Sequence, residues 1–144
     1  MRNESLLSQE YTKVNSLLLG FTKNHSMNQF AFADRAFSFA QSEDLNPEWF
    51  VYRGGLIKDS RCFCKERNGG YFHRFEVESW GSGADLGACG TGDLWQGAIK
   101  GTNSSNIWIV LGGYNCLHSI MPVSSFRVPE ADKERARSKG FYNF

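Results

Sequence analysis

The stretch Leu111–Val123, LGGYNCLHSIMPV, decides how the rest of the chain is interpreted. It contains a glycine pair, then Cys116 and His118 one residue apart, then an apolar exit that ends at Pro122 and Val123. Residues two apart on a β-strand point to the same face. If this stretch is a strand, we expect Cys116 and His118 to project together from one surface. Such a pair can be half of a metal site, a nucleophile with its base, or two half-buried core residues.

The composition is that of a globular protein with one domain, or one domain and an appendage. The chain has 144 residues, of which 41% are hydrophobic and 15% aromatic, and its twelve Phe predict aromatic packing or a surface that a partner covers. The formal net charge of +1 argues against a chain that binds polyanions along its whole surface. A local cluster of basic residues is most simply a solvated face: Lys58, Arg61, Lys65 and Arg67.

The sequence also predicts a compartment. It has no run of about 18 apolar residues, so we expect no membrane-spanning helix. The first residues, MRNESLLSQEY, lack the apolar segment of a signal peptide. Both features favour a chain that is made, and at first used, in a cytoplasm. Four Cys in such a chain are expected to be reduced thiols or metal ligands and not disulfides.

Residues 1–45 are predicted to form a helical N-terminal region with two helices. Residues 5–19 carry one apolar stripe, which contains Leu7, Tyr11, Val14 and Leu18. Residues 27–41 carry two apolar faces, one with Phe30, Ala33, Phe37 and Ala40, the other with Phe32, Ala36 and Phe39. A helix that is apolar on nearly every side is either buried or lies between subunits. We favour the second, because a chain this small has little material to surround such a helix.

Residues 46–144 are predicted to form a compact Cys/His-bearing domain. The segments 49–53, 71–73 and 107–111 favour strands. Residues 75–80 and 129–139 favour short helices, the latter with Pro at its start and Gly140 at its end. We expect the glycine-rich segment 81–92 to be flexible or to wrap around a neighbour, and the aromatic residues 141–144 to dock on the core or on a neighbour. The predicted fold class is α+β, a helical appendage followed by a small domain that zinc would staple.

The best metal quartet in the chain is Cys64, His73, Cys116 and His118. Two thiolates and two imidazoles would satisfy tetrahedral zinc and would join two distant segments of a small domain. The spacing is not that of a common zinc finger, and Cys62 and Cys89 are competing ligands. The alternative is that the thiols are small core residues and that the histidines are hydrogen-bonded.

Two enzymatic interpretations compete with a structural site. A nucleophile would pair Cys116 or Cys64 with His73 or His118, but no carboxylate is obviously placed to orient the imidazole. A small metal-dependent nuclease acting on DNA would use His73 and His118, with Asp59 or Glu76 as partners. The spacing of these residues in the sequence does not match that of HNH nucleases.

Residues 50–125 resemble the phage Mu F-like minor head protein family of head morphogenesis proteins. The resemblance rests on Asp59-Ser60-Arg61 with Phe63-Cys64, on Asn68-Gly69 with Tyr71-Phe72-His73, on Trp80 and Trp95-Gln96-Gly97, and on GGYNCLH followed by Pro122-Val123. This chain departs from the family pattern at Leu117-His118, where the family commonly has Arg-Cys. It also lacks an obvious preceding His-Pro segment.

The resemblance implies a component of a tailed-phage virion, made in the host cytoplasm and associated with the portal or with the major capsid protein on the inner capsid surface. Contact with packaged DNA would follow from that location. The family has no catalytic residues to transfer, so the resemblance implies a structural role for Cys64, His73, Cys116 and His118. We therefore expect a non-enzymatic protein, with the nuclease as the alternative.

Overall fold

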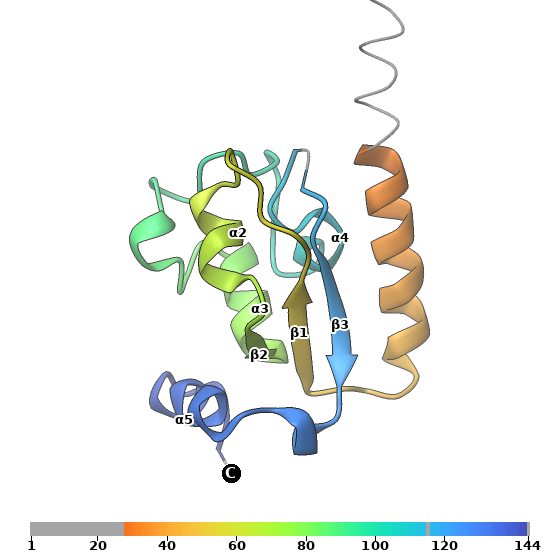
Figure 1. Ribbon diagram of the computed structural model, residues 1–144, viewed down its shortest axis with the longest axis vertical. Helices are drawn as coiled ribbons and strands as arrows, with labels where there is room; N and C mark the ends of the chain where they lie inside the picture. The colour runs from red at the N-terminus through yellow and green to blue at the C-terminus, as the bar shows by residue number, and fades with distance from the viewer. Residues whose placement is uncertain (1–27, 115, 144) are drawn as a thin grey trace, which may run out of the picture.

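The computed structural model describes residues 28–114 and 116–143, which fold as an α+β domain with a helix over residues 28–43 at its side (Figure 1). The predicted helix over residues 5–19 lies outside the described residues. The predicted α+β class is confirmed by the elements that follow the first helix: β1 (Trp49–Arg53), α2 (Cys62–Arg67), β2 (Tyr71–His73), α3 (Arg74–Gly81), η1 (Gly87–Cys89), α4 (Ile107–Val110), β3 (Ser119–Val123), η2 (Ser125–Arg127) and α5 (Glu130–Ser138). None of the helices in the described part of the chain is long and apolar enough to cross a membrane.

The three strands form one antiparallel sheet in the order β2-β1-β3. β1 is central because WFVYR is aromatic and β-branched and its side chains can be buried on both faces. Trp49 lies opposite His73 on β2 and Val123 on β3, and Arg53 lies opposite Ser119. The ends of β1 therefore face different parts of the chain, His73 at the start and the segment before Ser119 at the end.

Aromatic side chains fill the core on the α2 and α3 side of the sheet. Tyr52, Phe63 and Trp80 are each at most 1% exposed, and their rings meet edge to face with centroids 5.6–6.4 Å apart. Each such ring pair stabilises the fold by about 0.5–1.5 kcal/mol beyond the contribution of its buried apolar area. A second cluster forms at the start of β1, where Phe141 and Tyr142 pack against Trp49. The C-terminal aromatic residues that the structure describes thus dock on the protein's own core.

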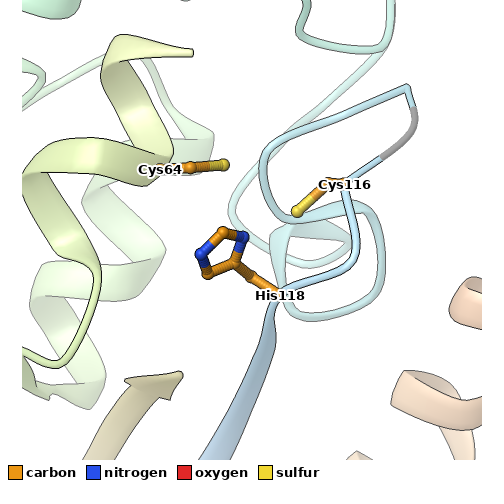
Figure 2. A group of neighbouring side chains, drawn as sticks. All are labelled: Cys64, Cys116 and His118. Atoms are coloured by element: carbon orange, nitrogen blue, oxygen red, sulfur yellow. The ribbon is translucent and has the colours of Figure 1, made fainter. Parts of the chain in front are cut away.

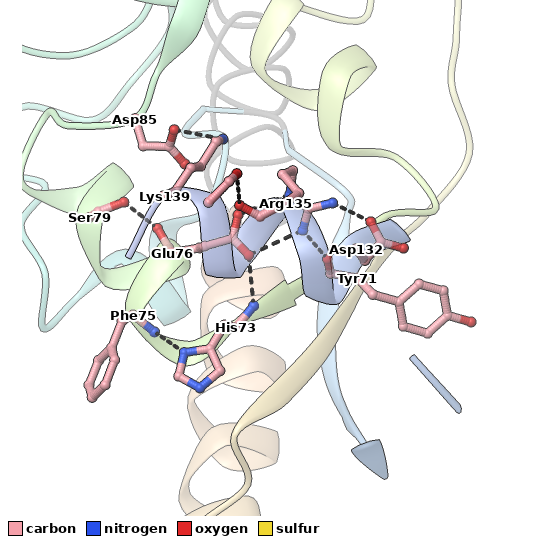
Figure 3. A network of polar contacts seen from close by, with 10 residues as sticks. Tyr71, His73, Phe75, Glu76, Ser79, Asp85, Asp132, Arg135 and Lys139 are labelled. Carbon is pink, nitrogen blue, oxygen red and sulfur yellow. Dashed lines mark hydrogen bonds and ion pairs between the residues drawn. The ribbon is translucent and has the colours of Figure 1, made fainter. Parts of the chain in front are cut away.

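A buried carboxylate ties α5 to β2 and α3 (Figure 3). Glu76 is 0% exposed, and it accepts hydrogen bonds from the backbone N–H of His73 at 3.1 Å and from Nε and Nη2 of Arg135 at 3.2 and 3.1 Å. The Nδ1 atom of His73 in turn accepts from the backbone N–H of Phe75 at 3.2 Å. His73 and Glu76 thus form a capping box at the start of α3, with His73 in the place usually taken by Ser or Thr.

The predicted strand over residues 107–111 is wrong, because Ile107–Val110 forms the helix α4. The cause lies just upstream. Asn103 Oδ1 accepts from the backbone N–H of Ser105 and Asn106, and Asn106 Oδ1 accepts from the backbone N–H of Asn103. These local side-chain bonds start a helical turn that the β-branched residues then continue. Of the opening stretch, only its end is a strand, Ser119–Val123.

The prediction that all four cysteines are reduced is also wrong. Cys62 and Cys89 form a disulfide that joins the start of α2 to the turn η1. The glycine-rich segment is held there, because the turn brings Cys89 to within a Cα–Cα distance of 5.6 Å of Cys62. Cys64 and Cys116 remain free thiols, and both are buried.

The helix over residues 28–43 has the two faces that the sequence predicts. Phe32, Ala36 and Phe39 are half-buried, and the Phe39 ring stacks on Trp108 at 5.0 Å. Phe30 and Phe37 on the other face are 77% and 64% exposed. Arg35 fixes the helix to the domain. Its Nε and Nη1 donate to the carbonyls of His118 and Ile109, both at 2.9 Å, and its Nη2 donates to the carbonyl of Cys116.

We expect Arg35→Met to lower the free energy of unfolding by about 3 kcal/mol. The carbonyl groups of Ile109, Cys116 and His118, which are buried or partly buried, would lose the hydrogen-bond donor that Arg35 supplies. Urea denaturation followed by circular dichroism measures this. Arg53→Met is the matched control, since Arg53 is exposed and should change stability by about 0.5 kcal/mol or less. Equal effects of the two substitutions would contradict the role given to Arg35.

Candidate metal centre

Three of the four predicted ligands meet in space (Figure 2). Cys64, Cys116 and His118 each offer one ligand atom, and these atoms all lie within 4.8 Å of one another. Cys64 comes from α2, whereas Cys116 and His118 come from the loop that leads into β3. All three residues are only 4–5% exposed. The cluster therefore joins two distant segments, and its geometry could hold a metal ion.

The structure does not bring His73 to this cluster. His73 pairs with Trp49 at the start of β1, whereas the His118 ring lies against Gly54, just past the end of that strand. Five residues of strand span roughly 16 Å. His73 also has another task, because its Nδ1 caps α3. A nuclease centre that needs His73 and His118 side by side is not formed by this arrangement.

Arg61 shapes the loop that carries Cys116. This residue precedes α2, and its guanidinium donates to the carbonyls of Gly97, Gly112 and Tyr114. Arg35 donates to carbonyls of the same loop from the helix over residues 28–43. Charge-assisted bonds of this kind are about twice as strong as neutral ones. The loop is thus fixed by two arginines, and not by pairing in the sheet.

Close approach of backbone to sulfur requires glycine at position 112. A Cβ atom there would lie 2.7 Å from Cys64 Sγ and 3.1 Å from Cys116 Sγ. The first distance is too short for a carbon–sulfur contact and the second is tight, so Cys64 Sγ would have to move beside any larger residue. The glycine pair of the opening stretch therefore serves the packing of the two sulfur atoms.

His118 is oriented by two neighbours. Its Nε2 lies 3.2 Å from Oδ1 of Asn68, the residue that follows α2. Because this oxygen can only accept, Nε2 carries the proton and Nδ1 is left as the atom that can bind a metal. The imidazole also stacks on the Tyr52 ring, with centroids 5.1 Å apart and an interplanar angle of 23°.

The two free thiols share a proton. The hydrogen bond from Cys64 is the largest influence on Cys116 and lowers the pKa of its thiol to about 3; His118 and the charge of Arg35 act in the same direction, and burial opposes them. The same hydrogen bond and burial raise the pKa of the Cys64 thiol. The hydrogen bond between the two thiols thus lowers the pKa of one and raises that of the other. A metal ion would displace the remaining protons, since thiolate and neutral imidazole are the ligand forms.

Tyr52 closes the inner side of the cluster. Its hydroxyl lies 3.5 Å from Cys64 Sγ and 3.8 Å from Cys116 Sγ. Burial, followed by the two nearby thiols, raises the pKa of Tyr52 well above its usual value. The hydroxyl therefore stays protonated and can donate to a sulfur atom. It supports the ligands from the core side.

The outer side of the cluster opens into a cavity of about 310 Å³. Besides the three ligands, the cavity is lined by Gly55, Ile57, Asp59, Ser60, Arg61 and Leu117. A second group of donors, Cys62, Glu66 and Cys89, also lies close together, but its two sulfur atoms are bonded to each other. Because Cys62 and Cys89 are bonded to each other, neither is a free thiol that could replace Cys64 or Cys116 as a ligand.

Sequence reasoning missed Asn68, Tyr52 and Arg35 as parts of the site. Asn68 lies 50 positions from His118, so no local pattern connects the two residues. Asn68 also supplies the orienting group whose absence argued against a Cys–His nucleophile. The neighbouring thiol of Cys64, however, makes the trio a better match to a metal centre, which uses both sulfur atoms.

Comparisons with protein-family models, with curated proteins and with solved structures find no match to this chain.

We expect Asn68→Ala to weaken the binding of a metal ion at the trio about 10- to 100-fold, because the imidazole of His118 loses the acceptor that fixes its tautomer. Competition with a chromophoric chelator measures the affinity. Asn143→Ala, at an exposed position, is the control and should leave the affinity unchanged. Unaltered affinity in the Asn68 variant would contradict the assigned role.

Proposed function

We propose that this chain is a non-enzymatic structural component of a tailed-phage head, in which a zinc-stapled domain carries a helix that attaches to the portal or the major capsid protein. The observation that carries the proposal is the meeting of Cys64, Cys116 and His118 in the interior. Cys64 and Cys116 belong to the segments on which the resemblance to Mu F-like minor head proteins rests, and His118 stands where that family commonly has Cys. A buried cluster that joins α2 to the closing loop fits a device that holds a fold together.

Zinc is the metal that suits this donor set best. Two thiolates and one imidazole are soft and borderline ligands, which favour Zn²⁺ over Mg²⁺ or Ca²⁺. The ion would connect α2 to the loop before β3, since 52 positions separate Cys64 from Cys116. Its binding free energy would add to the stability of the fold.

We expect purified protein to contain about one equivalent of zinc, because the trio forms a single site. Elemental analysis by mass spectrometry measures it. Cys116→Ser should abolish the zinc content. The matched control is the double variant Cys62→Ser with Cys89→Ser, which loses the disulfide but keeps the three ligands. Folded, metal-free wild-type protein would refute the zinc proposal.

The attachment surface that we propose is the apolar stripe of the helix over residues 28–43, formed by Phe30, Ala33, Phe37 and Ala40. All four residues are exposed. The opposite face is fixed to the domain through Arg35 and Phe39, so the stripe has a defined direction. Exposed apolar stripes of this kind mark interaction sites. Attachment near the portal would also bring the protein close to packaged DNA.

We expect the double variant Phe30→Ser with Phe37→Ser to be lost from virions. Burial of each Phe contributes about 1.5–3 kcal/mol, so the loss of both should weaken attachment at least about 100-fold. Copy number in purified particles, measured by quantitative mass spectrometry, tests this. Phe126→Ser is the control, because Phe126 is 95% exposed on η2 and outside the stripe. Retention of the double variant at wild-type copy number would contradict the proposal.

A further inference from the structure

We propose that a metal ion held by Cys64, Cys116 and His118 keeps its fourth coordination position open to the cavity beside Ile57, and that this position takes a thiolate from outside the chain. The inference rests on the metal centre of the preceding proposal. It goes further, because a purely structural zinc site has four protein ligands, whereas an open position makes the ion a binding site.

No fourth protein ligand is at hand among the described residues. The trio is the whole group of Cys, His, Asp and Glu donors that lies within 4.8 Å there. His73 is at the other end of β1 and caps α3. The Tyr52 hydroxyl lies on the core side, away from the cavity, at 3.5 Å from Cys64 Sγ and 3.8 Å from Cys116 Sγ. Asp59 lines the cavity, but it is an exposed residue and is not one of the close donors.

The free side of the trio is the cavity side. Tyr52 closes the inner side, where its hydroxyl lies within 3.8 Å of both sulfur atoms. All three donor residues line the cavity, whose volume of about 310 Å³ is some ten times the roughly 30 Å³ share of one water molecule. A ligand of several non-hydrogen atoms therefore fits against the ion. Ile57 and Leu117, which are 72% and 68% exposed, form apolar walls at the entrance.

Charge and softness select a thiolate. A divalent ion with two thiolates is neutral, and the guanidinium groups of Arg35 and Arg61 lie on two sides of the loop that carries Cys116, so their two positive charges exceed the one negative charge of Asp59 in the cavity lining. Their positive charges favour an anion over a neutral ligand at the fourth position. Two sulfur ligands already make the ion a soft acceptor, which prefers sulfur to a carboxylate oxygen. The apolar walls suit the carbon chain of a small thiol.

The test uses the full chain loaded with Co²⁺, whose absorption spectrum reports on the number of Co–S bonds. The Cys62→Ser, Cys89→Ser background is used, so that an added thiol has no disulfide to reduce. Titration with 2-mercaptoethanol should raise the sulfur-to-cobalt charge-transfer absorbance about 1.5-fold, because a third Co–S bond joins two. Ile57→Trp should reduce the affinity for the thiol while Co²⁺ uptake stays unchanged. Leu45→Trp is the control, because Leu45 is exposed and lies near the other end of β1.

A spectrum that does not respond to the thiol, or that responds equally in the Ile57→Trp variant, would overturn the open position and leave the metal centre standing. A changed spectrum in His73→Asn would overturn it too, because it would place His73 on the ion; Asn keeps the cap of α3. Failure to take up Co²⁺ at all would overturn the metal centre itself. A cysteine-containing hexapeptide, titrated in parallel, separates the two sources of thiolate. Tighter binding of 2-mercaptoethanol indicates a free thiol, and tighter binding of the peptide indicates a partner's cysteine.

Discussion

The rest of the structure depends on how the inward-facing carbonyl groups around residues 109–118 find donors. A buried carbonyl without a donor costs about 1–3 kcal/mol, and among the described residues no strand pairs with this loop to supply one. Arg35 reaches it from the helix over residues 28–43, and Arg61 reaches it from the start of α2. Guanidinium groups suit the task because each presents several donors in a fixed plane. The two side chains determine where the loop runs, and so where Cys116 and His118 lie.

The positions of the ligands follow from that constraint. Gly112 allows the backbone to pass close to both sulfur atoms, Tyr52 supports them from the core, and Asn68 turns His118 toward them. Each contact comes from a different element, so every member of the trio is held by at least one neighbour. The three donor atoms, all within 4.8 Å of one another, are thus already gathered where an ion would bind. The helix over residues 28–43 is tied to the same cluster, because Arg35 donates hydrogen bonds to the carbonyls of Cys116 and His118.

Local patterns in the sequence predicted most of the elements. The aromatic, β-branched WFVYR gave β1, Tyr71–His73 gave β2, and the two apolar faces of the helix over residues 28–43 are as expected. The pattern failed at Ile107–Val110, where the asparagines upstream outweigh β-branched propensity. It also failed at Cys62 and Cys89. These residues are 27 positions apart in the sequence, and a turn that local patterns do not predict brings them together. Cys64, Cys116 and His118 could be named as ligands from their types, but Arg35 and Asn68 could not. Their partners are backbone carbonyls and a side chain far along the sequence, which carry no local signal.

The central claim is that the trio holds zinc in the folded protein. X-ray absorption at the zinc edge of the purified, unlabelled protein tests it most directly, because the method counts ligands by element and distance. The account predicts two sulfur atoms at about 2.3 Å and at least one nitrogen at about 2.0–2.1 Å from the ion. The zinc edge should disappear when Cys116 is replaced by Ser, since the site then keeps a single sulfur ligand. A zinc edge that is absent, or a coordination shell of nitrogen and oxygen alone, would contradict the account.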